Sequence, residues 1–171
     1  IGDCAEFNVP PEGRKLIEQV WYTGRMHGET LAKTICGEHS AYSPGHWFNS
    51  AKFFDIEYQT YGWVGNTLKE NEAAFYWEHP NGKISFRVIY DKITEHLIGI
   101  NVFGIRMRHE VFDQWLSDGR RIDYVIEHLR EANFNPEFYR KHEPKIIEKY
   151  NQQLGKILKL KNREFTNKIF K

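Results

Sequence analysis

Alternation of hydrophobic and polar residues dominates the middle of the chain and predicts β-strands there. Four segments follow this period-two pattern: residues 52–61, 73–78, 83–90 and 97–103. The second and third flank Asn81 and Gly82, a pair that favours the positive φ of a tight hairpin turn. The pattern therefore predicts an antiparallel sheet of three to five strands.

Hydrophobic residues spaced by three and four predict one long helix before the sheet, between Pro10 and a stop at Gly37. The expected apolar stripe of this helix consists of Leu16, Val20, Thr23 or Gly24, Leu31 and Ile35. Gly24 and Gly28 lie four residues apart and hence on one face of the helix. Glycines there allow a backbone or a ligand to approach closely, and tight helix packing explains the same spacing equally well.

The last third of the chain again has helical periodicity. A short helix is predicted over residues 110–116 with a stop at Gly119, followed by an amphipathic segment. The apolar stripe of that segment consists of Ile122, Val125, Ile126 and Leu129. Asn135-Pro136-Glu137 has the form of a helix cap, and Pro144 limits or restarts the helix that follows. Together these elements predict an α+β fold in which the antiparallel sheet packs on helices.

Composition narrows the class of protein. The chain has 171 residues and a mass of 20.4 kDa, which suits one domain or one domain with an appended piece. With 40% hydrophobic and 27% charged residues, its composition is that of neither a disordered nor a membrane-spanning protein. Because 24 basic residues nearly balance 23 acidic ones, the overall charge gives no case for binding nucleic acid. We therefore expect neither a nucleic acid nor a membrane as a partner.

The cysteine content bears on the compartment. Cys4 and Cys36 are too few for a disulfide framework or a four-cysteine zinc site, so a cytoplasmic location is the simpler expectation. Cys36, near the end of the first helix, is expected to be a small core residue.

The C-terminal segment, residues 156–171, is locally basic. It contains six basic residues and one acidic residue, so it carries +5 while residues 1–155 carry −4. We expect this tail either to dock on the acidic body of the protein or to remain solvated, and both are favoured over a nucleic-acid-binding arm.

Few patterns in the chain indicate catalysis. None of its eight histidines has the spacing of a zinc site and no serine or cysteine lies in a nucleophile motif, so we predict no metal site and no catalytic residue. The chain also lacks the Gly-x-Gly-x-x-Gly and Walker sequences that bind nucleotides. Its many aromatic residues indicate a core or an interface rather than base stacking, because the strands carry acids such as Asp55, Glu57 and Glu78.

The first residues have neither an initiator methionine nor the charged and apolar regions of a targeting peptide. An apolar residue that runs directly into Gly2-Asp3 is typical of the end of a buried strand whose beginning lies elsewhere. We therefore expect the chain to be the C-terminal part of a longer protein.

Ile1-Gly2-Asp3-Cys4-Ala5-Glu6 resembles the second flavin-binding motif of FAD-dependent pyridine nucleotide-disulfide oxidoreductases. This group includes NADH oxidases, rubredoxin and ferredoxin reductases, and the flavin half of assimilatory nitrite reductase. Residues 20–37 look like the helix that follows this motif in the family, and residues 50–57 are similar to the strand that opens its C-terminal domain. The resemblance covers residues 1–117, and the later residues depart from the family pattern.

The resemblance implies which residues contribute to an FAD site. The motif aspartate of the family, here Asp3, accepts a hydrogen bond from the ribityl chain, and Gly2 allows close approach of the cofactor to the backbone. The backbone of Val20, Trp21 and Tyr22 would lie beside the isoalloxazine ring, where the helix dipole stabilises negative charge on the reduced flavin. The residues themselves leave other roles open: Asp3 as a cap, and Trp21 and Tyr22 as core or dimer contacts.

The resemblance also implies a division of labour along the chain. Residues 1–42 would be the end of an FAD-binding domain, residues 43–117 an antiparallel-sheet interface domain that forms a homodimer, and residues 118–171 a helical extension with the basic tail. The parent enzyme would transfer hydride from NAD(P)H to FAD and on to an unknown acceptor. The chain would pack against the preceding FAD- and NAD-binding domains and be inactive alone. The alternative is a non-catalytic interaction domain that pairs through its aromatic sheet face.

Overall fold

The computed structural model describes three stretches of the chain: residues 1–10, 14–134 and 140–162. The chain divides into two compact units, Ile1–Asn49 and Ser50–Lys171. The first unit contains a short 3-10 helix, η1 (Gly2–Cys4), and the long helix α1 (Trp21–Ile35). The sheet and the remaining helices belong to the second unit, with the first strand starting at the boundary.

Helix α1 starts at Trp21, so the prediction of a helix that follows the Pro10 turn is wrong for residues 14–20. The Phe7 amide donates a hydrogen bond of 2.9 Å to the Leu16 carbonyl oxygen. This pairing between distant segments holds the chain before α1 outside helical conformation, because tertiary contacts override local propensity. The helix ends at the predicted stop, where Gly37 has a φ of 92° that glycine adopts readily.

The apolar stripe expected on α1 is not buried. Thr23 is the buried residue of the helix, whereas Leu31 and Ile35 are 39% and 75% exposed. Cys36 is also exposed, so its prediction as a core residue is wrong. Within the first unit, the helix face that carries Gly24 packs against η1 instead.

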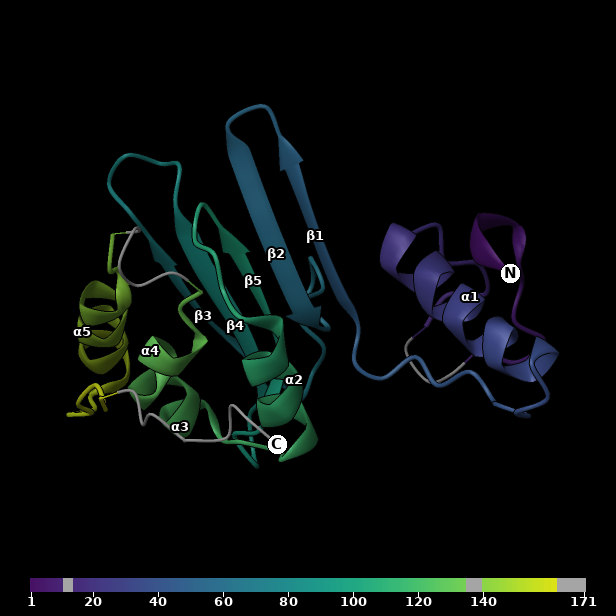
Figure 1. Cartoon of the computed structure of the whole chain (residues 1–171). Helices are drawn as coiled ribbons and strands as arrows, with labels where there is room; N and C mark the ends of the chain where they lie inside the picture. The colour runs from purple at the N-terminus through teal and green to yellow at the C-terminus, as the bar shows by residue number, and fades with distance from the viewer. Residues whose placement is uncertain (11–13, 135–139, 163–171) are drawn as a thin grey trace. The chain divides into compact units, whose positions relative to one another are not determined.

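Five strands form one sheet: β1 (Phe48–Phe53), β2 (Ile56–Gly62), β3 (Glu72–Glu78), β4 (Ser85–Asp91) and β5 (Leu97–Phe103). Their order in space is β1-β2-β5-β4-β3 (Figure 1). Strand β5 pairs with β2 and with β4, and β4 pairs with β3, all antiparallel. The predicted antiparallel sheet is confirmed, and the three strands predicted after residue 72 lie within two residues of their observed bounds.

The single strand predicted over residues 52–61 is wrong, because the chain reverses at Phe54 and Asp55 to form the hairpin of β1 and β2. Phe54 has a φ of 55°, a left-handed conformation that residues with a Cβ atom rarely adopt. Neither residue is the glycine or asparagine that usually marks such a turn. The alternating pattern therefore continues through the turn and hides it.

In the described residues after the sheet there are four helices: α2 (His109–Ser117), α3 (Ile122–Glu127), α4 (Leu129–Ala132) and α5 (Glu143–Leu154). The predicted short helix before Gly119 and the helix restart at Pro144 are confirmed. The four residues of the predicted apolar stripe are all fully buried, although the helix that carries them breaks at His128 into α3 and α4. The predicted cap Asn135-Pro136-Glu137 lies outside the described residues.

One face of the sheet forms the hydrophobic core. Residues opposite one another in the register share this face in two rows: Tyr61, Ile100, Val88 and Phe75, then Val102, Phe86 and Trp77. Each of them is at most 6% exposed. Tyr61 stacks on Phe112 of α2 with ring centroids 5.1 Å apart, and Phe75 meets Tyr150 of α5 at 5.0 Å. The helices thus cover this face (Figure 1), and the predicted α+β architecture is confirmed.

The described part of the basic tail docks on the helices. The Lys156 ammonium donates to both carboxylate oxygens of Asp123 at 2.6 Å. Further along, the Lys161 amide donates to the Glu127 carbonyl oxygen at 2.8 Å. Docking on the acidic body of the same chain was one of the two expectations for this segment, and it holds for the described residues 156–162. Residues 163–171 lie outside the described part.

Candidate functional site

The residues that the sequence suggests for a cofactor site lie in the first unit, where η1 packs against the first two turns of α1. Gly2 has a φ of 79°, and its amide donates a hydrogen bond of 3.2 Å to Nδ1 of His27. A Cβ atom built on Gly24 would lie 3.7 Å from the Gly2 Cα atom. At Gly24 a Cβ atom would therefore make only an ordinary van der Waals contact with η1, and a Cβ on Gly28 would meet no described atom within 4 Å, so neither glycine is required by a close backbone approach within the described residues.

This packing brings Asp3 beside the first turns of α1. Asp3 is exposed, and a Cβ atom built on the neighbouring Gly2 would meet no described atom within 4 Å. An exposed carboxylate can accept hydrogen bonds from ligand hydroxyls, and the open backbone beside it lets a ligand approach closely. Gly2 and Asp3, the two residues predicted from the motif, therefore lie together in η1, which packs against the face of α1 that carries Gly24.

The start of α1 has no side-chain cap. Val20 precedes the helix with a φ of −134°, and its side chain carries no hydrogen-bond acceptor. The first N–H groups of a helix carry partial positive charge, which favours an anionic or polar group nearby.

Trp21 is 68% exposed at this end, with the Arg25 guanidinium 5.9 Å from its ring. Tyr22 is half-buried, and its ring centroid lies 4.9 Å from that of Phe48, so its side chain is a packing contact.

A buried ion pair precedes α1, and the sequence analysis missed it. Arg14 Nε lies 2.7 Å from Glu18 Oε1, with the two side chains 5% and 2% exposed. The Thr23 hydroxyl donates to Glu18 Oε2 at 3.3 Å, and the Arg14 guanidinium lies 5.0 Å from the Trp47 ring. The pair ties the segment before α1 to the first turn of the helix. Its only signal in the sequence is an i,i+4 spacing of opposite charges, which is common on solvated helices and does not indicate burial.

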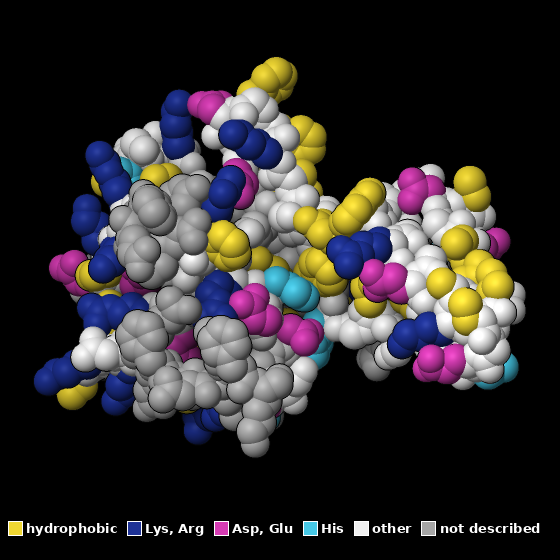
Figure 2. All heavy atoms as spheres, in the orientation of Figure 1, with side chains coloured by type: hydrophobic (Ala, Val, Ile, Leu, Met, Phe, Trp, Pro, Cys, Tyr) yellow, Lys and Arg dark blue, Asp and Glu magenta, His cyan; other side chains and the backbone are white. Residues whose placement is uncertain are grey.

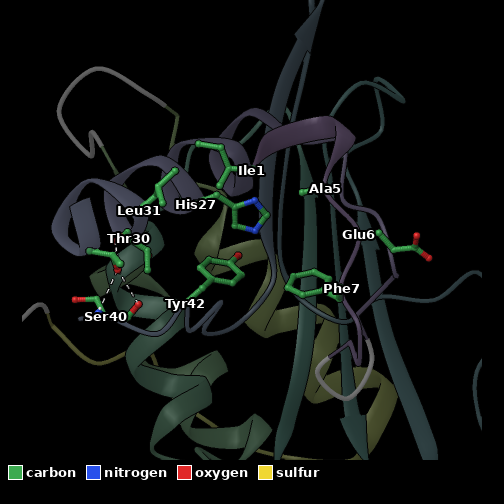
Figure 3. A pocket seen from close by; sticks show the side chains of 10 residues that line it. Ile1, Ala5, Glu6, Phe7, His27, Thr30, Leu31, Ser40 and Tyr42 are labelled. Carbon is green, nitrogen blue, oxygen red and sulfur yellow. Dashed lines mark hydrogen bonds between the residues drawn. The ribbon is translucent and has the colours of Figure 1, made fainter. Parts of the chain in front are cut away.

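A pocket of about 330 Å³ opens beside the contact of η1 with α1 (Figure 3). The pocket is lined by the first seven residues, by α1 and by the segment that follows α1. Its lining residues include Ile1, Phe7, His27, Leu31, Thr34 and Tyr42. The His27 ring lies edge-on to Phe7 at 5.9 Å and to Tyr42 at 4.3 Å. Burial lowers the pKa of His27, so the ring is neutral near pH 7 and Nδ1 can accept the Gly2 amide proton.

The described residues offer no metal site beside this pocket. No group of three or more His, Cys, Asp or Glu side chains among them could hold a metal ion. Both cysteines are free and exposed. Within the same residues, no helix is both long enough and apolar enough to cross a membrane. The candidate site therefore consists of Gly2, Asp3 and the start of α1.

Comparison with known proteins decides the fold. No protein-family model matches the chain, and no curated protein matches it. A NAD-dependent persulfide reductase from A. fulgidus aligns with 90% of the chain at a TM-score of 0.63 and 20% sequence identity. A pyridine nucleotide-disulfide family oxidoreductase from Enterococcus faecalis V583 aligns with 91% at a TM-score of 0.54 and 16% identity. The chain has the fold of part of a pyridine nucleotide-disulfide oxidoreductase.

The likeness extends further along the chain than the sequence resemblance did. An alignment over 90% of the 171 residues must reach beyond residue 117, into the part of the chain for which the sequence resemblance gave no match. The chain spans 31% of the length of the persulfide reductase and 40% of the length of the second oxidoreductase. The resemblance of the chain to part of a pyridine nucleotide-disulfide oxidoreductase is therefore confirmed at the level of the fold.

Proposed function

We propose that the chain is the C-terminal part of an FAD-dependent oxidoreductase that moves hydride from NAD(P)H to FAD and passes electrons to a further acceptor. The shared fold with part of two oxidoreductases supports this proposal. The observation that carries it is the packing of η1 against α1 at Gly24, where a Cβ atom would lie 3.7 Å from the Gly2 Cα atom. That contact sets Asp3 against the first two turns of a helix whose start has no side-chain cap.

The residues present fit an FAD molecule. Asp3, with its exposed carboxylate, would accept a hydrogen bond from a ribityl hydroxyl, and the open backbone at Gly2 would let the ribityl chain approach. The backbone from Val20 through Trp21 and Tyr22 would stabilise negative charge on the pyrimidine edge of the ring. FAD itself supplies the capacity to accept a hydride from a nicotinamide.

In this proposal the chain contributes positioning and assembly but no catalytic residue. Residues 1–42 complete an FAD-binding domain, residues 43–117 form the sheet domain of a homodimer, and residues 118–171 extend that domain. Nucleotide binding depends on FAD- and NAD-binding domains of the same protein, so the chain alone is inactive. We place the enzyme in the cytoplasm, where its two free, exposed cysteines would stay reduced.

A visible absorption spectrum tests the proposal. The complete gene product that contains this sequence is expressed and purified, and its spectrum is recorded before and after addition of NADH or NADPH. We expect flavin bands that bleach with one of the two nucleotides, which also identifies the hydride donor. A colourless protein that gains no flavin band when FAD is added would overturn the proposal.

A second candidate function is that of a non-catalytic interaction domain that pairs through the sheet. It is favoured by the exposure of large apolar side chains on the second unit, where Phe53 is 60% and Tyr76 48% exposed. Such surface is typical of sites where proteins associate. This function requires no flavin, so the same spectrum separates the two candidates.

A further inference from the structure

Two histidines from distant parts of the sequence meet at one end of the second unit. His79 lies in the turn between β3 and β4, and His142 directly precedes α5. Their ring centroids are 5.5 Å apart, and the ring planes are nearly perpendicular, at 80°. Both rings also contact the buried Trp77 of β3, from which His142 lies 5.6 Å and His79 6.2 Å. These three rings therefore join the β3–β4 turn to the start of α5.

A hydrogen bond within the turn depends on a neutral His79 ring. The Asn81 amide donates to His79 Nδ1 at 3.2 Å, and a protonated imidazole cannot accept this bond because both of its nitrogens are donors. Glu78, the acidic residue next to His79 in the sequence, lies on the other face of the sheet from Trp77. Its carboxylate accepts a hydrogen bond of 2.7 Å from the Tyr76 hydroxyl. Protonation of His79 would therefore remove one bond of the turn.

The surroundings of His142 disfavour a positive charge. The residue is 8% exposed, so an imidazolium there would lose most of its hydration. It precedes the 12-residue helix α5, whose first N–H groups carry partial positive charge. Arg140 and Lys145 act on the ring in the same sense, because like charges repel. Arg106, from the segment after β5, adds a guanidinium to the cavity of about 170 Å³ that His142 lines.

One acidic group near His142 acts in the opposite sense. Glu143 is 3% exposed, and its Oε1 accepts a hydrogen bond of 2.7 Å from Asn133 Nδ2. Its negative charge raises the pKa of His142, but burial, followed by the charge of His79, lowers that pKa by more. Figure 2 shows Lys and Arg side chains along the side of the second unit that carries α5 and the β3–β4 hairpin. The balance of these surroundings keeps His142 neutral near pH 7.

We propose that His79 and His142 form a pH-sensitive switch, which holds the β3–β4 turn against the start of α5 near neutral pH and releases it on acidification. Two imidazolium rings 5.5 Å apart would repel each other, and a proton on His79 would remove the Asn81 hydrogen bond. Release separates His142 from Ile84, which follows the turn, and so opens the cavity that both residues line.

The direction of the switch follows from the titration of His142. Because the pKa of His142 is lowered in the folded chain, the unfolded chain binds this proton first as the pH falls. The stability that the contact contributes is therefore present above pH 6.5 and is lost as the pH falls below that value. The switch lies within the second unit and does not depend on flavin binding.

NMR of the complete 171-residue chain between about pH 7.5 and about pH 4.5 tests the switch. We expect the indole signal of Trp77 to shift together with the imidazole signals of His79 and His142. Hydrogen-exchange protection of residues 81–84 and 145–147 should fall at least about tenfold over the same range. Protection in β5 should persist, because the change is confined to the turn and the start of α5.

His79→Gln separates the switch from other effects of acid. Glutamine can accept the Asn81 hydrogen bond and does not titrate, so release should require a lower pH and His142 should titrate at a higher pH than in the wild type. The matched control is His96→Gln, which changes an exposed histidine in the turn at the opposite end of β4 and should leave the release unaltered.

Other results of these measurements would overturn the proposal. If Trp77 and residues 81–84 stay unchanged while both histidines titrate, the two rings do not control the contact. An equal pH dependence in the wild type and His79→Gln, or an equally large change in His96→Gln, would place the responsible group elsewhere. Loss of protection in β5 at the same pH would show that the chain unfolds as a whole, so that no separate switch exists.

Discussion

The Gly2 amide donates its hydrogen bond to Nδ1 of His27 and so fastens η1 to the second turn of α1, with 3.2 Å between the two nitrogens. The bond requires a neutral imidazole, because both nitrogens of a protonated ring are donors. Burial lowers the pKa of His27 below its ordinary value of 6.5. As the pH falls, the unfolded chain therefore binds this proton before the folded chain does. The free energy of unfolding that the contact contributes is thus present above pH 6.5 and is lost as the pH falls below that value.

The first prediction concerns this titration. Between pH 7.5 and pH 5 we expect the NMR signals of Gly2 and Asp3 to shift with the protonation of His27, because η1 is released from α1. His27→Gln keeps an acceptor that does not titrate and should remove the shift, whereas the exposed His39→Gln should preserve it. Signals of Gly2 that move independently of the His27 ring would contradict the prediction.

The second prediction concerns FAD retention by the complete gene product. Asp3→Ala removes a hydrogen bond to a charged acceptor that contributes about 1.5 to 3 kcal/mol, so FAD affinity should fall by about 10-fold to 150-fold. The flavin content after dialysis measures the loss. Glu38→Ala, which removes another exposed carboxylate from the first unit, should retain the cofactor. Full retention by Asp3→Ala would remove Asp3 from the proposed site.

The third prediction concerns the backbone crossing in the second unit. A methyl group at Gly99 would stand 2.4 Å from the Trp63 carbonyl oxygen and could only fit if the main chain moved. Gly99→Ala should therefore lower the free energy of unfolding by about 2 to 3 kcal/mol. Urea denaturation measures this. As a control, Gly28→Ala in α1 meets open space and should raise stability by up to about 1 kcal/mol. An unchanged midpoint for Gly99→Ala would mean that the crossing is looser than described.

The sheet was predictable where core-facing side chains recur at every second position. In β4 and β5, Phe86, Val88, Ile100 and Val102 enter the core, so alternation in the sequence reports the core face, although Ile89 on the opposite face is also fully buried. Asn81-Gly82 marks the turn between β3 and β4. At Phe54 and Asp55 the same alternation runs through a reversal that no glycine marks, so the sequence indicated one strand where the structure has two.

The candidate site was predictable only in part, for a related reason. Gly2 and Asp3 are recognisable as a short motif, but the helix start depends on a contact between Phe7 and Leu16 that no local pattern reports. The buried pair of Arg14 with Glu18 escaped prediction for the same reason, since its burial follows from packing against Trp47 and not from spacing. Local periodicity reports local geometry, and these features depend on long-range contacts.

The last prediction concerns the docked C-terminal segment. The buried Tyr150 hydroxyl donates to Asp123 Oδ1 at 2.7 Å, and the Lys156 ammonium donates to both oxygens of the same carboxylate at 2.6 Å. Asp123→Ala leaves the Tyr150 hydroxyl buried without its acceptor, which costs about 1 to 3 kcal/mol of stability. It also removes the nearest partner of Lys156 and leaves its ammonium the longer contact with Glu95 Oε1 at 3.8 Å, so hydrogen exchange in residues 156–162 should accelerate more than exchange in the sheet.

Glu148→Ala, on the exposed side of α5, changes a carboxylate that does not contact this segment and should leave both quantities nearly unaltered. Lys156→Met distinguishes the two parts of the effect. It removes the ammonium but retains the bond between Tyr150 and Asp123, so exchange in the segment should accelerate with a smaller loss of stability. If Asp123→Ala and Lys156→Met destabilise the chain equally, the tyrosine bond contributes nothing measurable and the segment is held by the lysine alone.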